Sequence, residues 1–187
     1  LGDVRLYTFP RGIIERAIVQ RIDRRVGAQF LRLLGIDWDF RELPRSEKIK
    51  RNGQPIEFER VIWIAHSLGS VISYNVLSDL FHHAADLQRD GDEEQKRNVA
   101  RFRTSLRRFI TLGSPLDKFS FLWGKQVLRP MPAGRSELLE GGEDVSVGTD
   151  ATRREWWINF YHVLDPVSGA LSSPLMCGTD GPVNFHI

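Results

Sequence analysis

The junction at residues 61 to 77, VIWIAHSLGSVISYNVL, constrains the fold of this chain more than any other stretch. It begins as a short, continuous apolar run rich in branched residues, which is typical of a strand covered on both faces. It ends with apolar residues at helical spacing. The polar pair His66-Ser67 lies between the two, with the small residues Ala65 and Gly69 on either side. This pattern predicts a strand that turns directly into a helix at Ser67.

The rest of the chain extends the same alternation of strands and helices. Apolar residues recur at steps of three and four over 12–34, which predicts a long amphipathic helix. Residues 35–57 are expected to be irregular, and the charged residues 88–98 to form a loop or the start of a helix. Further strands are predicted within 108–115, within 156–169 and near 183–185. We expect an α/β fold, a mostly parallel sheet flanked by helices, in one domain over residues 1–187.

Composition and charge exclude several classes of protein. The 26 basic and 24 acidic residues nearly balance, so the whole chain gives no case for nucleic-acid binding. The single cysteine, Cys177, excludes an intrachain disulfide and a multi-cysteine zinc site, and agrees with a cytoplasmic location. No apolar run reaches the roughly 18 residues of a membrane span, and the N-terminus lacks the layout of a signal peptide. No metal or organic cofactor is implied.

A strand that turns straight into a helix is suited to presenting a nucleophile. A serine hydroxyl attacks a substrate well only when it projects from the backbone towards a base, and a tight, strained turn achieves this for Ser67. We expect strand and helix nearly to touch at the turn, so that Ala65 and Gly69 must be small. The backbone N–H of Leu68, at the helix N-terminus, is expected to stabilise a developing oxyanion.

These residues resemble the nucleophile elbow of the α/β-hydrolase superfamily, in its lipase and esterase branch. Ala65 stands where the usual Gly-x-Ser-x-Gly motif has its first glycine. FITLGSPL (109–116) is similar to the strand after the elbow helix, and WINFYHVLDPVSG (157–169) to the strand that ends in the catalytic acid. The resemblance covers most of the chain but only the later half of the family's fold.

The resemblance implies a catalytic triad in the chain order serine, acid, histidine. Ser67 would be the nucleophile, Asp165 the acid, and His186 the base, because it is the histidine downstream of Asp165. Asp117 is the alternative acid, since some lipases place theirs after the preceding strand. Asp165 before a proline could also be a simple turn residue. His66 and His162 are expected to be structural.

The N-terminal part departs from the family pattern. Residues 1–59 show one long helix and little that reads as strand, so we expect the N-terminal strands of the fold to be missing and the chain to be a fragment of a longer protein. The second oxyanion donor would then lie upstream of Leu1. We expect this piece alone to be inactive or unstable, and a longer protein to hydrolyse esters.

Two further stretches bear on the substrate and on partners. Phe119, Phe121 and Trp123 could wall an acyl pocket or belong to the core. A basic amphipathic stretch can bind an anionic membrane surface, although a solvated face balanced by nearby acids explains it as well. Its basic residues are Lys96, Arg97, Arg101, Arg103, Arg107 and Arg108.

The sequence thus favours a serine hydrolase that cleaves a carboxylic ester, of a lipid or another acyl compound, through an acyl-enzyme. The alternative is a catalytically silent α/β-hydrolase-like module that binds a partner or a membrane surface. The acyl chain, the head group, and the choice between lipase, esterase, thioesterase and amidase stay open.

Overall fold

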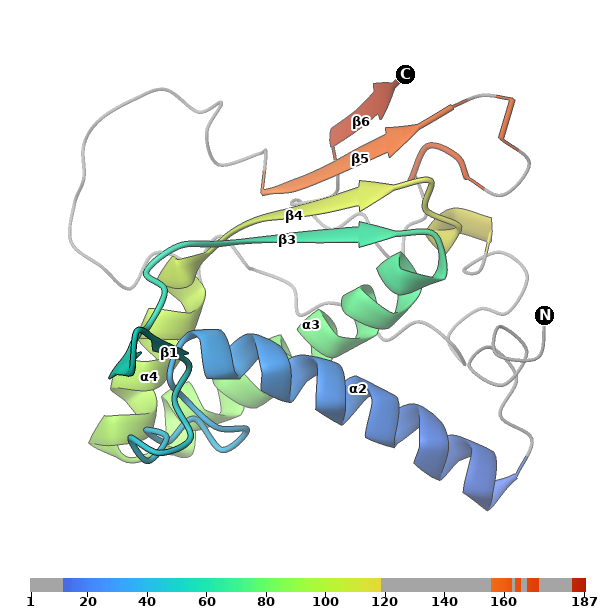
Figure 1. Ribbon diagram of the computed structural model, residues 1–187. Helices are drawn as coiled ribbons and strands as arrows, with labels where there is room; N and C mark the ends of the chain where they lie inside the picture. The colour runs from blue at the N-terminus through green and yellow to red at the C-terminus, as the bar shows by residue number, and fades with distance from the viewer. Residues whose placement is uncertain (1–11, 119–155, 163, 166–167, 172–182) are drawn as a thin grey trace.

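A computed structural model describes residues 12–118, 156–162, 164–165, 168–171 and 183–187. The expected irregular region beyond Lys118, with Phe119, Phe121 and Trp123, lies outside these residues. The described part has an α/β architecture in which three long helices lie on one side of a parallel sheet (Figure 1). The α/β prediction is confirmed at this level.

The sheet contains four strands in the order in which they occur along the chain. They are β3 (Val61–His66), β4 (Leu106–Leu112), β5 (Trp157–Tyr161) and β6 (Val183–His186). All neighbouring pairs are parallel, and Ile64, Ile110, Ile158 and Val183 follow one another in register across the sheet. Because the strands are parallel, their carboxyl ends meet at one edge of the sheet.

Three helices form the layer beneath the sheet: α2 (Ile13–Leu33), α3 (Leu68–Asp90) and α4 (Glu93–Ser105). The helix predicted over 12–34 is confirmed. The charged stretch 88–98 contains the short connection between α3 and α4, where Asp92 and Gln95 form a reciprocal capping box. Gly91 makes the joint tight, because a Cβ at this position would collide with the carbonyl oxygen of Leu87.

The core lies between the helices and the near side of the sheet. Phe30 of α2 packs on Trp63 of β3 with ring centroids 4.8 Å apart, and Phe109 packs on Trp157 at 5.3 Å. The indole N–H groups of these tryptophans have partners, since Trp63 donates to Ser73 Oγ and Trp157 to Thr111 Oγ1.

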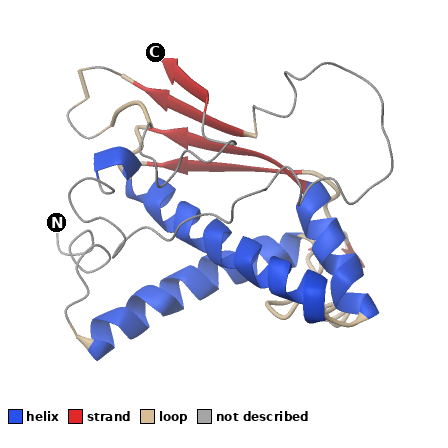
Figure 2. Cartoon of the chain, turned by 180° about the vertical axis from the view of Figure 1, so that it is seen from behind, coloured by secondary structure: helices blue, strands red, loops and turns tan. Residues whose placement is uncertain are grey.

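None of the described helices lies on the other side of the sheet (Figure 2). Ile62 and Ile64 of β3 are 57% and 62% exposed, so the expectation that this strand is covered on both faces is wrong. The connection from β3 to β4 is fully described, and its helices α3 and α4 lie on the same side of the sheet as α2.

The segment between α2 and β3 is more ordered than we expected. It contains a small hairpin of β1 (Lys50–Arg51) and β2 (Gln54–Pro55). The turn residues Asn52 and Gly53 both have positive φ, 52° and 76°. An Asn-Gly pair is the strongest short-range signal for such a turn, although we had expected this segment to be irregular.

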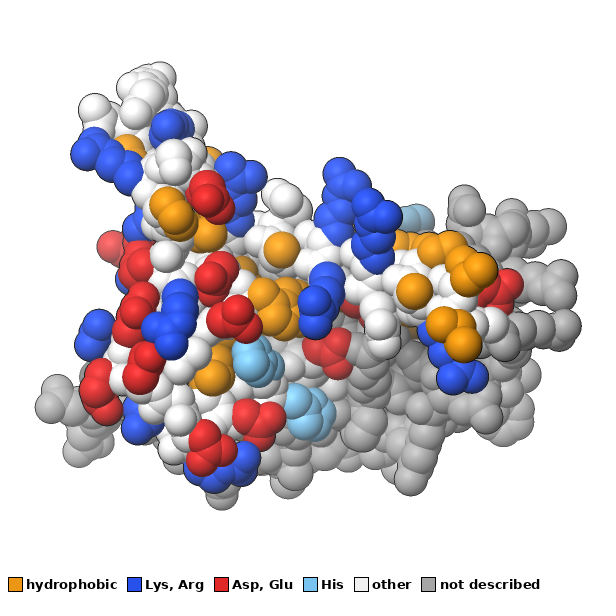
Figure 3. Space-filling model, turned by 90° about the horizontal axis from the view of Figure 1, so that it is seen from below, with side chains coloured by type: hydrophobic (Ala, Val, Ile, Leu, Met, Phe, Trp, Pro, Cys, Tyr) orange, Lys and Arg blue, Asp and Glu red, His pale blue; other side chains and the backbone are white. Residues whose placement is uncertain are grey.

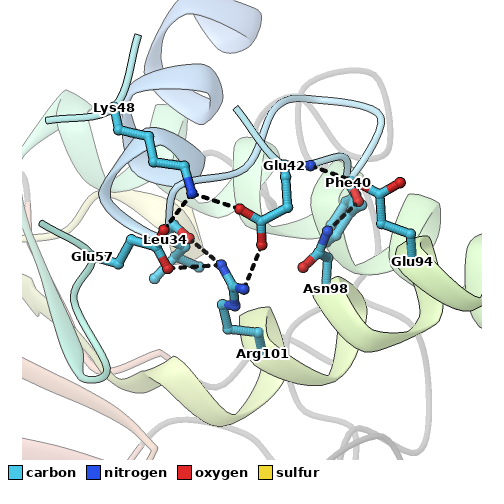
Figure 4. Close-up of polar contacts among 8 residues, drawn as sticks. All are labelled: Leu34, Phe40, Glu42, Lys48, Glu57, Glu94, Asn98 and Arg101. Carbon is cyan, nitrogen blue, oxygen red and sulfur yellow. Dashed lines mark hydrogen bonds and ion pairs between the residues drawn. The ribbon is translucent and has the colours of Figure 1, made fainter. Parts of the chain in front are cut away.

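A group of charged side chains fastens this segment to α4 (Figure 4). Arg101 donates to Leu34 O at 2.9 Å, to Glu57 at 3.1 Å and to Glu42 at 2.6 Å. Lys48 donates to the remaining oxygens of Glu42 and Glu57, at 2.7 and 2.6 Å. The group ties the chain that enters β3 to the helix that leads into β4.

Within the described residues, none of the helices is long and apolar enough to cross a membrane.

Candidate functional site

Ser67 is the single residue between β3 and α3. Its backbone φ and ψ are 50° and −129°, a conformation that residues other than glycine rarely adopt. A backbone of this kind costs about 1–3 kcal/mol and persists only when the surroundings hold it in place. The predicted turn from strand directly into helix is confirmed at this residue.

Hydrogen bonds hold the strained turn on both sides. The N–H of Ser67 donates to Leu112 O of the neighbouring strand at 3.0 Å. Its carbonyl oxygen accepts from the N–H of Ser70 at 2.9 Å and from the Ser70 hydroxyl at 2.6 Å. The Ser70 hydroxyl also bonds to that of Ser114, at 2.7 Å, in a buried position. This serine pair, which we did not predict, links the turn after β3 to the end of β4.

We expected Ala65 and Gly69 to be small because space is short on both sides of the turn, and the structure does not show this at Gly69. Ala65 is buried in the core beneath the sheet. A Cβ added at Gly69 would meet nothing within 4 Å, so our expectation that residue 69 must be small because strand and helix nearly touch is wrong. The turn is held by hydrogen bonds rather than by a shortage of space at Gly69.

Leu68 is the first residue of α3, as expected. N–H groups in the first turn of a helix lack acceptors within that helix, and they form its positive end. The first turn of α3 carries no acidic side chain that would compensate this charge. The N–H of Leu68 therefore lies in a local field suited to an oxyanion.

β5 ends at Tyr161, earlier than we predicted. Asp165 lies four residues beyond this end, at the same edge of the sheet as Ser67. Its N–H donates to His162 O at 3.0 Å, which makes a short turn after the strand. A Cβ added at Gly113, the residue after β4, would lie 3.7 Å from Asp165 Oδ2 and 3.6 Å from His66 Nε2. The predicted acid and His66, which we had expected to be structural, therefore both lie beside Gly113, but no hydrogen bond or ion pair between them is seen among the described residues.

His186 ends β6 and lies in register with Tyr161. Its exposed ring contacts Tyr161 and His162, with ring centroids 5.7 and 5.6 Å apart. Strands lie about 4.8 Å apart, so β6 is roughly 14 Å from β3. His186 shares the sheet edge with Ser67, but no hydrogen bond among the described residues joins the Ser67 hydroxyl to an imidazole.

The remaining candidates fall into two groups. Asp117 is half-buried in the short stretch after β4, close in sequence to Gly113, and stays the alternative acid. The predicted pocket residues Phe119, Phe121 and Trp123 lie outside the part of the chain that the structure describes.

A separate hollow of about 560 Å³ opens between α2 and α3. It is lined by Gln20, Asp23, Arg24, Trp38, Asp79, His82 and His83. Asp79 lies twelve helical residues beyond Ser67, about 18 Å along the axis, so this hollow is not part of the elbow. Among the described residues, no group of three or more histidine, cysteine or acidic side chains is arranged to hold a metal ion.

Comparison with known proteins found no family model that matches the chain, and no curated protein or solved structure that resembles it.

Proposed function

We propose that this chain carries the nucleophile of a serine hydrolase of the α/β-hydrolase type, which cleaves a carboxylic ester through an acyl-enzyme. The observation that carries the proposal is the backbone of Ser67, a non-glycine residue at φ 50° held alone between a parallel strand and a helix. A strained turn in this place projects the side chain beyond the sheet edge, where a substrate can approach it.

Each role in the reaction has a candidate residue. The Ser67 oxygen would attack the ester carbonyl carbon while His186 takes its proton, and Asp165 would stabilise the charged imidazole. The N–H of Leu68 would bind the oxyanion of the tetrahedral intermediate. The alcohol would leave with the proton, and water would then release the acid from Ser67.

The topology supports this assignment of roles. Ser67, Asp165 and His186 follow or end three parallel strands in the order that the resemblance implies, and all three lie at the same sheet edge. The proposal requires the His186 imidazole to approach Ser67 when substrate is bound. Catalytic hydrogen bonds are often long in the absence of substrate and tighten in the complex.

Labelling with a fluorophosphonate, which reacts with activated serines, tests the proposal. We expect the full-length protein to be labelled at Ser67 and Ser67→Ala to lose the label. Ser46→Ala is the matched control, because Ser46 is exposed and far from the elbow in sequence. Undiminished labelling of a folded Ser67→Ala variant would rule out Ser67 as the nucleophile.

The same label distinguishes the second candidate, a catalytically silent module of the same fold. The observation that favours it is that His186 contacts the end of β5 rather than Ser67. A full-length protein that melts cooperatively and takes up no label would support the silent module.

A silent module would need a binding surface, and the basic stretch offers less of one than its sequence suggests. Arg101 is engaged with Glu42 and Glu57, and Arg103 is only 8% exposed. On the helix side of the molecule, positive and negative side chains are intermixed (Figure 3).

Peripheral contact of the basic stretch with an anionic membrane would therefore depend on the exposed Arg97 and Arg107. Salt-sensitive binding to phosphatidylserine vesicles, lost in Arg97→Gln/Arg107→Gln, would support such contact.

A further inference from the structure

Helix α2 has one side on which every residue is exposed. Residues that recur at steps of three and four lie on the same side of a helix. On this side of α2 they are Ile13, Ile14, Ala17, Ile18, Arg21, Arg24, Arg25, Ala28 and Arg32, and each of them is exposed. The opposite side holds the buried Asp23 and Phe30. We call the exposed side the outer face of α2.

The first two turns of the outer face are apolar. Ile13 and Ile14 are 89% and 77% exposed, and Ile18 is 38% exposed. In both ribbon views this end of α2 extends away from α3 and from the sheet (Figures 1 and 2). In the view from below, hydrophobic side chains gather on it (Figure 3). Exposed isoleucines that lie together, rather than singly, indicate a surface that contacts something apolar.

The next turns of the outer face are cationic. Arg21, Arg24 and Arg25 form no ion pair with any of the described residues. By contrast, Arg89 of α3 and Arg101 of α4 each bond two carboxylates. The outer face carries no acidic side chain, so its charge has a single sign.

We infer that the outer face of α2 binds an anionic membrane surface. The isoleucines of its first two turns enter the boundary between head groups and acyl chains, and its arginines lie against the lipid phosphates. Apolar residues and clustered arginines on one helix match the two layers of such a surface, one apolar and one charged. The inference goes beyond the proposed hydrolysis and does not depend on it.

The chemistry of the outer face is less suited to other partners. A nucleic acid would bind the arginines through its phosphates, but it would leave the isoleucines in water. A second copy of the chain that packed its outer face on this one would bring arginines of like charge together. A membrane surface satisfies both halves of the face at once.

Co-sedimentation of the full-length protein with lipid vesicles tests the inference. We expect binding to vesicles of phosphatidylserine and phosphatidylcholine in equal parts, and little binding to phosphatidylcholine alone. Each basic residue near an anionic surface strengthens binding roughly fivefold, so Arg21→Gln/Arg25→Gln should weaken it about 20- to 30-fold. Arg97→Gln/Arg107→Gln is the matched control, because it removes two exposed arginines elsewhere in the chain. It should bind within about twofold of wild type, since salt screens distant charges.

The isoleucines are tested separately. Ile13→Gln/Ile14→Gln removes apolar surface without changing the charge, and glutamine forms helices at least as well as isoleucine. We expect vesicle binding to fall about tenfold, and the loss to persist in high salt, because salt does not screen apolar contacts. Both side chains are largely exposed, so the variant should melt at the same temperature as wild type.

Four results would overturn the inference. The first is a folded full-length protein that binds neither kind of vesicle, and the second is an equal loss of binding in Arg21→Gln/Arg25→Gln and in the control. The third is binding to a DNA duplex that needs the arginines but not the isoleucines, which would make a nucleic acid the partner. The fourth is self-association that Ile13→Gln/Ile14→Gln abolishes, which would assign the face to a second copy.

The test is independent of the proposed hydrolysis. We expect Ser67→Ala to bind vesicles as wild type does. Loss of fluorophosphonate labelling with intact vesicle binding would therefore refute the proposed function alone, and labelling at Ser67 without vesicle binding would refute this inference alone.

Discussion

At the scale of single residues, the elbow combines one strained backbone with a short chain of serines. Ser67 keeps its unfavourable φ because its N–H and carbonyl oxygen are both bonded, to Leu112 and to Ser70. The Ser70 hydroxyl in turn bonds to Ser114 after β4. The backbone geometry of Ser67 therefore depends on two buried hydroxyl groups, those of Ser70 and Ser114.

Ser70→Ala removes both hydroxyl contacts and leaves the Ser114 hydroxyl buried without that partner. We expect a loss of about 1–3 kcal/mol in the free energy of unfolding, measured by denaturant titration. The double variant Ser70→Ala/Ser114→Ala should lose less than the sum of the two single variants, because no hydroxyl is then left unpaired. Strictly additive losses would contradict a direct bond between the two serines.

Gly69→Ala tests the space beside Ser67. The added Cβ meets nothing within 4 Å, and alanine favours a helix more than glycine by up to about 1 kcal/mol. We expect unfolding of Gly69→Ala at an equal or slightly higher denaturant concentration than wild type. A loss above about 1 kcal/mol would show that strand and helix are closer at this position than the structure places them.

At the scale of elements, local sequence patterns predicted what depends on local physics. The helix over 12–34, the strand–helix junction at Ser67 and the strand near Val183 all appear within a few residues of their predicted bounds. We did not predict the hairpin at Asn52-Gly53, although its turn signal is local. Its strands have only two residues each, too few to show an alternation of apolar and polar residues.

The charged group that anchors the segment before β3 predicts a dependence on pH. Burial raises the pKa of Glu42, but hydrogen bonds from Lys48 and Arg101 outweigh it and hold the pKa below its ordinary value. The stabilisation from Glu42 is therefore complete above the ordinary glutamate pKa of about 4.3 and is lost as the pH falls through the lowered value.

We expect the free energy of unfolding of Glu42→Gln to fall less steeply with acid than that of wild type, over pH 5 to 3 or thereabouts. Glu47→Gln is the matched control, because Glu47 is an exposed glutamate in the same segment. Because the Glu42 side chain is 39% exposed, the difference should shrink in high salt. If the free energy of unfolding falls equally with acid in wild type and in Glu42→Gln, the contacts of Glu42 with Lys48 and Arg101 are not a source of stability.

At the scale of the whole molecule, the candidate site could be predicted from the sequence only in part. Ser67 and Leu68 belong to one local motif, so they were found without knowledge of the fold. That His66 and Asp165 both lie beside Gly113 depends on the register of three neighbouring strands, which no local pattern encodes. Likewise, the register of β6 against β5 decides that His186 contacts Tyr161 and His162.

The one-sided helix layer has a practical consequence at the bench. With Ile62 and Ile64 more than half exposed on the native sheet, environment-sensitive dyes such as ANS will fluoresce with properly folded protein. A bright dye signal at room temperature is thus no sign of damage in this chain, and melting of its variants is better followed by circular dichroism or tryptophan emission.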